Sequence, residues 1–382
     1  MLSRLQERAA TNGRLAAFEC LCTMLSALPP DELRGRLQQL IAVSDFSWTE
    51  FVDLATDQLM VPALGERLER FGLRELLPEP VDRYLHSMLR LNRARNRRLA
   101  DEAIEIAAAL NETGTIPLYF KGGGALLAGL YDDPGVRVMS DLDVLVSQSR
   151  SDECIRRLNA VGYLADGAPR HPRDQCYAVL SSASRVAILD LHRDAIVYPF
   201  ERLLTSRDII AGAVEWRGSA TFAVPSATHQ VVLNIAHAQL HHNRNYIYGR
   251  IMLRSLFDLV LLARKFADRI DWQEIEYWFT AAGCGTALEF QYLSAEELLG
   301  FVPAGRFRPS VATRLLLRRA LYLTGHLAAH RFSDRILRVL VLLQRELSDR
   351  ELRSRLGRNL VDAKWWRRHL AAFKRGGTAA AP

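Results

Sequence analysis

The stretch YFKGGGALLAGLYDDPGVRVMSDLDVLV, residues 119–146, decides the fold that we predict for this chain. It places a lysine and three glycines directly after a short apolar run, and GALLAGLY then suits a short helix. DDPG is typical of a turn, and LDVLV has the length and branching of a buried strand. The stretch therefore predicts a strand, a glycine-rich turn, a short helix and a second strand.

The glycine run suggests an anion-binding turn. Gly122, Gly123 and Gly124 would let backbone amides approach a phosphate closely, and a helix N-terminus adds partial positive charge. The spacing fits neither the P-loop nor the dinucleotide fingerprint, because Lys121 precedes the glycines and position 127 is Leu. A plain tight turn is the alternative, so the run alone does not establish a phosphate site.

Three aspartates extend the pattern. Asp141 and Asp143 are two residues apart at the start of a predicted strand, so their side chains share one face. Such carboxylates repel one another, and a divalent cation such as Mg²⁺ or Mn²⁺ relieves the repulsion. Asp190 lies in VAILDLH with His192 on the same strand face. If this strand lies beside the one carrying Asp143, the three carboxylates suffice for two metal ions. Solvent-facing aspartates at a turn and on an edge strand are the alternatives.

The hydrophobic periodicity divides the chain into regions. Apolar residues recur at helical spacing before and after the quoted stretch, and the preceding region ends in one long predicted helix. Further strands are expected at QCYAVLSS and RVAILDLH, with a helix over residues 147–163 that ends near Gly162. We predict an N-terminal helical domain, an α/β core, a C-terminal helical domain and a disordered tail, over residues 1–113, 114–225, 226–375 and 376–382 respectively.

Composition limits the environment and the partners. The formal net charge is +7, and it comes mainly from arginine because lysine occurs only at four positions. Positive charge favours a polyanion such as a nucleotide or RNA. The apolar runs are too short to span a bilayer and no cleavable signal is evident, so we expect a cytoplasmic protein. No obligate protein partner is evident from the sequence. The five cysteines form no CxxC pair and are expected to be free thiols.

The combined pattern resembles the nucleotidyltransferase fold of the polymerase-beta superfamily. More narrowly, a lysine-glycine turn, Arg-x-x-x-Asp-x-Asp and Asp-x-His are similar to a group of largely uncharacterised bacterial nucleotidyltransferases. The flanking segments SWTEFVDLATDQLMVPALGERL and LNIAHAQLHH extend the similarity over residues 46–267. The resemblance implies an α+β protein with a polymerase-beta-type core, a small mixed sheet with helices, flanked by α-helical regions.

The resemblance also implies roles for individual residues. The three glycines would cradle the triphosphate, Asp141 and Asp143 would bind metal, and Asp190 would share a metal or activate the incoming hydroxyl. The wider superfamily has a serine after its glycine, where Gly124 here offers only an amide. Lys121 would compensate as a phosphate contact, or would instead cap a neighbouring carbonyl.

Four further residues have more than one interpretation. Arg137 would neutralise charge on the leaving pyrophosphate or brace Asp141. His237 and His241 share a helix face and would line an acceptor or base pocket together with His192; a metal pair and simple packing are the alternatives. Asp258 would anchor the same wall or act as a buried brace. Near the C-terminus, KWWRRHLAAFKR is typical of a docked amphipathic helix or of a nucleic-acid contact.

The sequence therefore predicts a metal-dependent nucleotidyltransferase. An acceptor hydroxyl, on a small molecule or a peptide, would attack the α-phosphate of an NTP and release pyrophosphate, with Asp190 as first proton acceptor and His192 behind it. Modification of RNA ends by a toxin-like enzyme, transfer of AMP to a protein, and a non-catalytic NTP-binding regulator remain alternatives. A glycosyltransferase fits less well, because it gives the glycine turn no purpose.

Overall fold

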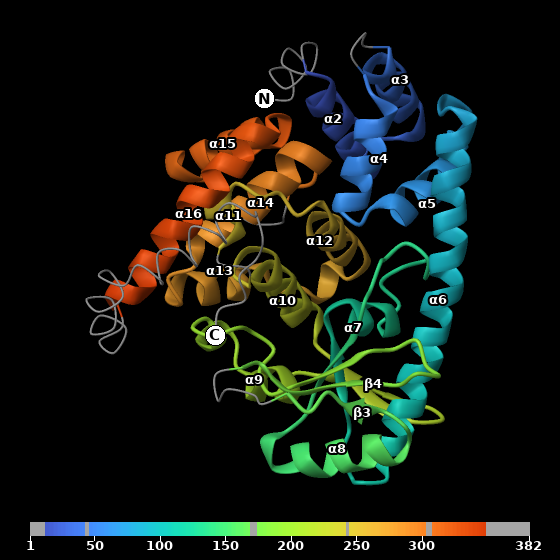
Figure 1. Ribbon diagram of the computed structural model, residues 1–382, viewed down its shortest axis with the longest axis vertical. Coiled ribbons are helices and arrows are strands. Elements are labelled where there is room, and N and C mark those ends of the chain that lie inside the picture. Colours follow the sequence, from blue (N-terminus) through green and yellow to red (C-terminus); the bar gives the residue numbers. More distant parts are fainter. Residues whose placement is uncertain (1–11, 43–45, 169–173, 242–243, 303–307, 349–382) are drawn as a thin grey trace, which may run out of the picture. The chain divides into compact units, whose positions relative to one another are not determined.

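The computed structural model describes residues 12–42, 46–168, 174–241, 244–302 and 308–348 (Figure 1). The chain divides into two compact units, Met1–Leu321 and Tyr322–Pro382. The predicted boundaries at residues 113 and 225 both fall within the first unit and stay predictions. KWWRRHLAAFKR and the predicted disordered tail lie outside the described residues.

The N-terminal region is helical, as predicted. Its elements are α2 (Gly13–Leu25), α3 (Pro30–Ile41), α4 (Trp48–Asp57), α5 (Val61–Phe71), a short 3-10 helix (Arg74–Leu76) and α6 (Glu79–Asn111). The side chains of Asn12 and Ser47 cap α2 and α4 by accepting hydrogen bonds from backbone amides three residues on. The predicted long helix is confirmed as α6, which is 33 residues long.

The middle region builds one mixed sheet of seven strands in the order β3-β4-β5-β2-β1-β7-β6. Strand β2 pairs antiparallel with β1 and parallel with β5. The bounds are β1 (Leu118–Phe120), β2 (Leu142–Leu145), β3 (Leu164–Ala165), β4 (Cys176–Ser181), β5 (Leu189–His192), β6 (Val214–Arg217) and β7 (Thr221–Val224).

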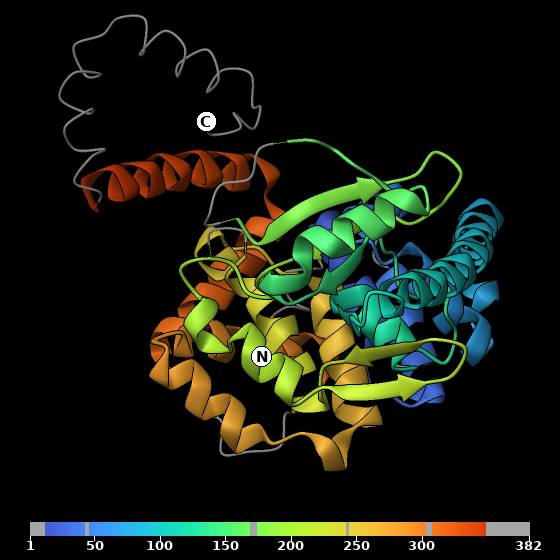
Figure 2. The ribbon, with the colours of Figure 1, turned by 90° about the horizontal axis from the view of Figure 1, so that it is seen from below.

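Four of these strands confirm the prediction, whereas β3, β6 and β7 were not predicted. Every residue of β3 and β6 is exposed, so neither strand carries the apolar alternation by which a half-buried strand is recognised. Figure 2 shows the β6–β7 hairpin in yellow. Helix α7 (Lys121–Leu127) begins at the lysine, three residues earlier than the predicted helix segment. Helix α8 (Ser151–Ala160) is confirmed, and Gly162 follows it with φ of 92°.

The C-terminal region is helical through residue 348, as predicted. Two short 3-10 helices (Gln148–Arg150 and Glu201–Leu203) and α9 (Ser206–Ala211) precede it. Its elements are α10 (Ala227–Gln239), α11 (Asn245–Tyr248), α12 (Leu253–Lys265), a 3-10 helix (Ala267–Arg269), α13 (Trp272–Ala281), α14 (Gly285–Leu299), α15 (Val311–Gly325) and α16 (Leu327–Ser348).

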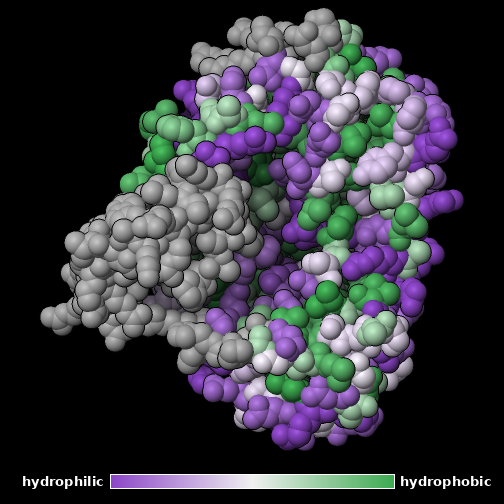
Figure 3. Space-filling view, in the orientation of Figure 1, coloured by the Kyte–Doolittle hydropathy of each residue, from purple (hydrophilic) through white to green (hydrophobic). Residues whose placement is uncertain are grey.

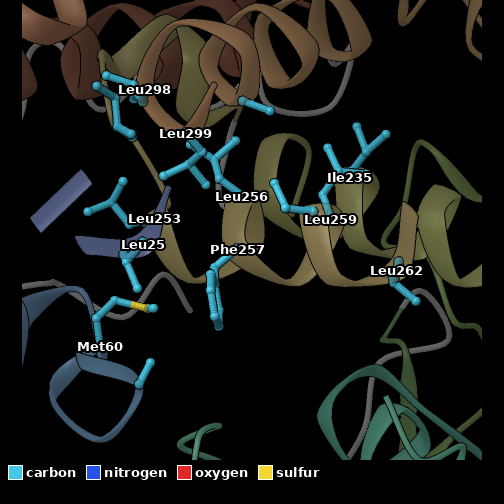
Figure 4. Close-up of a cluster of buried hydrophobic side chains, with 14 of the residues drawn as sticks. Leu25, Met60, Ile235, Leu253, Leu256, Phe257, Leu259, Leu262, Leu298 and Leu299 are labelled. Carbon is cyan, nitrogen blue, oxygen red and sulfur yellow. The ribbon is translucent and has the colours of Figure 1, made fainter. Parts of the chain in front are cut away.

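The sheet separates two hydrophobic cores. Tyr119, Leu142 and Val144 pack with residues of α6 and α8 on one face. Phe120 and Leu145 belong to the larger core on the other face, which includes α10, α12 and α14. Figure 4 shows Leu256 and Leu259 of α12 between Leu299 of α14 and Ile235 of α10. Because side chains alternate along a strand, a residue between Leu142 and Val144 faces α10 rather than α6.

No helix in the described part of the chain is long and apolar enough to cross a bilayer. Hydrophilic and hydrophobic side chains are interspersed on the face shown in Figure 3. The cytoplasmic location stays a prediction.

Candidate active site

The turn between β1 and α7 is packed too tightly for side chains. A Cβ on Gly123 would lie 2.8 Å from Leu142 Cδ2, and one on Gly124 would lie 2.4 Å from the carbonyl oxygen of Tyr119. The second contact is with backbone, which cannot move aside without displacing β1. A serine at position 124, which the resemblance would lead one to expect, would meet the same backbone contact, so only glycine fits there.

The first residues of α7 are oriented by an unusual backbone conformation. Lys121 adopts φ of 50°, in the left-handed region that non-glycine residues seldom occupy. The chain thereby turns sharply from β1 into the helix. The amides of Lys121, Gly122 and Gly123 fall in the first turn, where backbone donors have no partner earlier in the helix.

Two of the three predicted carboxylates lie on adjacent strands, and the third lies just before one of them. Asp143 of β2 is directly opposite Asp190 of the parallel strand β5, and Asp141 precedes β2 by one residue. Asp143 alternates with Leu142 and Val144, so its side chain is on the α10 face of the sheet. The sequence predicted convergence of the carboxylates only if the strands carrying Asp143 and Asp190 were neighbours. These strands are neighbours in the sheet.

Asp143 is buried and doubly paired. It is 3% exposed, and its Oδ1 accepts hydrogen bonds from Lys121 Nζ and lies 2.8 Å from His192 Nε2. Burial by itself raises the pKa of Asp143, but Lys121 and His192 outweigh it and hold the pKa far below the usual value. For Lys121 burial acts in the other direction and lowers the pKa, but the Asp143 carboxylate outweighs burial, and the pKa of Lys121 is raised overall. Both groups are therefore charged at neutral pH, and Lys121 contacts a carboxylate rather than a carbonyl.

Asp190 experiences the opposite balance. Burial raises its pKa first, and the negative charges of Asp143 and Asp141 raise it further. The pKa of this carboxyl group therefore reports crowding by two other carboxylates. A raised pKa suits a proton acceptor, because it brings the group nearer to neutral pH.

Arg137 and Asp258 form a buried brace. Arg137 Nε lies 2.8 Å from Asp258 Oδ2, with both side chains at most 11% exposed, and Tyr131 donates a hydrogen bond to Asp258 Oδ1 at 3.0 Å. The alternative brace between Arg137 and Asp141 is wrong, because the ion-pair partner of Arg137 is Asp258 on α12. This pair fixes the loop before Asp141 to α12.

A pocket opens beside Lys121 on the α10 face. It is lined by Lys121, Ala125, Leu130, Arg137, Gln230, Leu233, Asn234, His237, Ser255, Asp258 and Leu262. Predicted pocket residues His237 and Asp258 thus line a real pocket, and the rings of His237 and His241 lie 5.0 Å apart. Burial lowers the pKa of His237 well below its usual value, and the charge of Lys121 lowers it further. His237 is therefore neutral in the folded protein.

Sequence reasoning missed the residues that hold the aspartate loop. Asn92 and Asn96, four residues apart on α6, donate hydrogen bonds to backbone oxygens of Gly135, Pro134 and Arg137 at 2.6–3.0 Å. Asn96 is 0% exposed. Two asparagines at helical spacing within LNRARNRR are the sequence signal that could have found them, because a buried asparagine needs partners.

A second missed residue is Arg254 of α12. Among the described residues it forms no ion pair, yet burial and then the charge of Arg137 lower its pKa to about 10, against an opposing effect of Asp258 and Asp141. A partly buried cation beside a carboxylate loop is suited to an anionic ligand. In the sequence it follows the apolar Leu253 without any motif, so nothing distinguished it from other arginines.

Cys176 also lies at the site. The thiol of Cys176, a carboxylate oxygen of Asp190 and a nitrogen of His192 all lie within 4.8 Å of one another. Asp190 thus belongs both to the trio of aspartates and to a sulfur-containing set. For Mg²⁺ the oxygen set is the relevant one, since Mg²⁺ prefers carboxylate and water ligands.

The structure therefore brings together β1, the glycines that open α7, and the aspartates at β2 and β5. We next compared the sequence with known protein families. The model of a family described as uncharacterised nucleotidyltransferase matches residues 44–300. The chain belongs to this family. The resemblance predicted over residues 46–267 is confirmed, and the match extends further through α14. A search of the curated proteins gave no match.

Membership in a nucleotidyltransferase family implies an NTP as substrate. The matched region covers the sheet, α7, α10 and α12, and so includes every residue that was predicted for the site.

Proposed function

We propose that this protein transfers a nucleoside monophosphate from an NTP to an acceptor hydroxyl, on a core of the polymerase-beta type. One observation carries the proposal: Asp143 and Asp190 are directly opposite on parallel strands, and Asp141 precedes the strand of Asp143 by one residue. Asp143 is paired with Lys121 and His192, whereas Asp141 and Asp190 are half-buried and form no ion pair among the described residues. The arrangement supports a site that gathers cations around a triphosphate.

The donor set fits Mg²⁺. Asp141, Asp143 and Asp190 supply carboxylate oxygens only, and their mutual repulsion would be relieved by a divalent cation. These three residues would hold the ion or ions. When bound, the metal stabilises negative charge on the attacking and leaving oxygens of a phosphoryl transfer.

The chain's own residues then bind and orient the reactants. The amides of Gly122 and Gly123 would contact the β- and γ-phosphates, and Lys121, which is paired with Asp143, would add its positive charge beside them. Arg254 is the better candidate than Arg137 for charge neutralisation, because Arg137 is already paired with Asp258. Asp190 accepts the proton of the acceptor hydroxyl. The hydroxyl oxygen bonds to the α-phosphorus as the bond to the bridging oxygen breaks, and pyrophosphate leaves with that electron pair.

The pocket on the α10 face is the proposed site of the nucleobase or the acceptor. Within the described part of the chain, the buried Gln230 Oε1 and Asn234 Oδ1 have no hydrogen-bond partner. Gln230 Nε2 is already used by the backbone oxygen of Pro225 at 2.9 Å. Unpartnered polar atoms that line a pocket beside Lys121 support hydrogen bonding to a polar ligand there.

Thermal stabilisation tests the proposal. A ligand that binds the folded state raises the melting temperature, by an amount that grows with its concentration over its dissociation constant. We expect one or more of the four NTPs to stabilise the protein only with Mg²⁺ or Mn²⁺. The Asp141→Asn/Asp143→Asn variant should lose this shift, whereas Asp152→Asn, an exposed aspartate on α8, should retain it.

Acceptor classes are separated in a second step. The stabilising NTP, labelled at the α-phosphate, is incubated with small hydroxyl compounds, peptides, the protein itself and RNA. Transfer to RNA ends or to protein would favour the corresponding alternative. Stabilisation without turnover on any acceptor would favour a non-catalytic regulator. No shift for any NTP in a folded sample would reject the proposed function.

A further inference from the structure

A second set of metal-ligating side chains overlaps the aspartates. Cys176 of β4 contributes a sulfur, Asp190 an oxygen and His192 a nitrogen, and these three atoms lie within 4.8 Å of one another. His192 is 2% exposed, whereas Cys176 and Asp190 are partly exposed and reachable from solvent. The proposed nucleotidyl transfer makes no use of the thiol.

An irregularity in strand β4 brings Cys176 to this position. Along the β4–β5 pair, Ala178 is opposite Leu191, but Cys176 rather than Tyr177 is opposite His192. The extra residue is a β-bulge, and bulges redirect side chains next to functional sites. Without it Tyr177 would oppose His192, so the bulge is what places sulfur beside the imidazole.

His192 is oriented as metal-binding histidines commonly are. Its Nε2 lies 2.8 Å from Asp143 Oδ1, while Cys176 Sγ lies 3.6 Å from Nδ1 and 3.7 Å from Nε2. A histidine that binds metal through one ring nitrogen usually donates the other N–H to a carboxylate, which fixes the ring. Here Nε2–H would donate to Asp143, which leaves the Nδ1 lone pair for a metal ion.

We propose that Cys176, Asp190 and His192 form a binding site for Zn²⁺. Thiolate, imidazole and carboxylate are the ligands that zinc prefers, and three protein ligands leave the fourth tetrahedral position for water. Binding requires the thiolate, so the thiol proton is released to solvent as the metal enters.

The consequence for catalysis rests on the proposed function. Asp190 belongs to both ligand sets, and His192 would be held by zinc while it still pairs with Asp143. Zinc therefore competes with Mg²⁺ for Asp190 and removes the proton acceptor. The site is expected to make the protein sensitive to inhibition by Zn²⁺.

Cobalt substitution tests the site on the full-length protein without any nucleotide. Co²⁺ bound to a thiolate gives a near-ultraviolet charge-transfer band, and tetrahedral Co²⁺ gives visible bands. We expect these bands in the wild type and in Cys284→Ser, whose thiol is buried elsewhere in the chain, but not in Cys176→Ser. Zn²⁺ should displace Co²⁺. The affinity of the protein for Zn²⁺ should fall more than about 100-fold in Cys176→Ser. Loss of a residue that only supports a metal ligand typically lowers the affinity by about 10- to 100-fold, so a larger loss indicates that Cys176 binds the metal directly.

A measurement on the wild type avoids reliance on variants. Zn²⁺ should slow the alkylation of Cys176. Mass spectrometry of the peptide that contains Cys176 measures the rate. Absence of the thiolate band in the wild type, its retention in Cys176→Ser, or unchanged alkylation of Cys176 would each overturn the inference.

Failure of this inference and failure of the proposed function are distinguishable. If Mg²⁺ and an NTP stabilise the protein but cobalt gives no Cys176-dependent band, only the zinc site is wrong. If the band depends on Cys176 but no NTP binds, the zinc site stands and the proposed function fails. If the protein binds both an NTP and Zn²⁺, then Zn²⁺ should reduce the thermal stabilisation by the NTP in the wild type and in Cys284→Ser, but not in Cys176→Ser. An equal reduction in Cys176→Ser would reject Asp190 as a ligand shared by the two sites.

Discussion

Asp143 and Asp190 lie directly opposite each other on the parallel strands β2 and β5, and their pKa values are shifted in opposite directions. Asp143 is buried against Lys121 and His192, which keep it ionised. Burial, and after it the negative charges of Asp143 and Asp141, favour the protonated form of Asp190. When the surroundings of two carboxyl groups shift their pKa values in opposite directions, the groups can take different roles. Here the ionised Asp143 suits metal binding, and Asp190, with its raised pKa, suits proton transfer.

Replacing Asp143 or Asp190 by asparagine should abolish nucleotidyl transfer with little change in shape. The amide cannot carry the negative charge that a metal ligand or a proton acceptor needs, so we expect a loss of kcat of at least about 100-fold. Pyrophosphate release with the stabilising NTP measures it. Activity within a few-fold of the wild type in either variant would remove that residue from the mechanism.

The pH dependence of stability should identify Asp190. Its folded-state pKa is raised above the usual 3.8, so between these two values the folded state binds more protons than the unfolded state. The free energy of unfolding therefore falls as pH rises through this window. Without divalent metal, Asp190→Asn should be more stable than the wild type at neutral pH, and the difference should vanish below the unfolded value. Urea unfolding at several pH values measures this, and an equal difference at all pH values would contradict it.

Gly124→Ala should destabilise the protein by about 1–3 kcal/mol, the usual cost of forcing extra volume into a packed site. Its Cβ would lie 2.4 Å from the Tyr119 carbonyl oxygen. Gly35 within α3 is the matched control, because nothing lies within 4 Å of a Cβ there. Gly35→Ala should stabilise the protein by about 0.5–1 kcal/mol, since alanine favours the helix. A similar effect of both substitutions on the free energy of unfolding would refute the steric role of the turn.

Variants of Arg137 and Arg254 should have different effects, one on the stability of the fold and the other on NTP binding. Arg137→Met leaves Asp258 buried and unpaired, which costs about 3–5 kcal/mol of folding free energy. Arg254→Met leaves no ion-pair partner behind among the described residues, so we expect weaker NTP binding with little change in stability. Denaturant unfolding and NTP titration of both variants measure these effects. Normal stability of Arg137→Met with weakened NTP binding would return the phosphate role to Arg137.

Local patterns determined much of this protein. The glycine turn, the two apolar runs around it and VAILDLH established β1, α7, β2 and β5, because each depends on residues within a few positions of one another. Asp141 and Asp143 were identifiable by their spacing of two residues at the start of a strand, and Asp190 because a carboxylate inside an apolar strand is costly unless it has a partner. Membership in the nucleotidyltransferase family was visible in the same motifs.

Tertiary structure alone decided the partners of those residues. Asp258 comes from α12, 121 positions beyond Arg137, and Asn96 reaches the loop before Asp141 from α6. The bulge that sets Cys176 opposite His192 depends on the pairing of β4 with β5. Such contacts join segments that are distant in sequence, and they form only where the packing of whole helices against the sheet brings those segments together. The chain therefore encodes the chemistry of the site locally, whereas packing decides which charge each group faces.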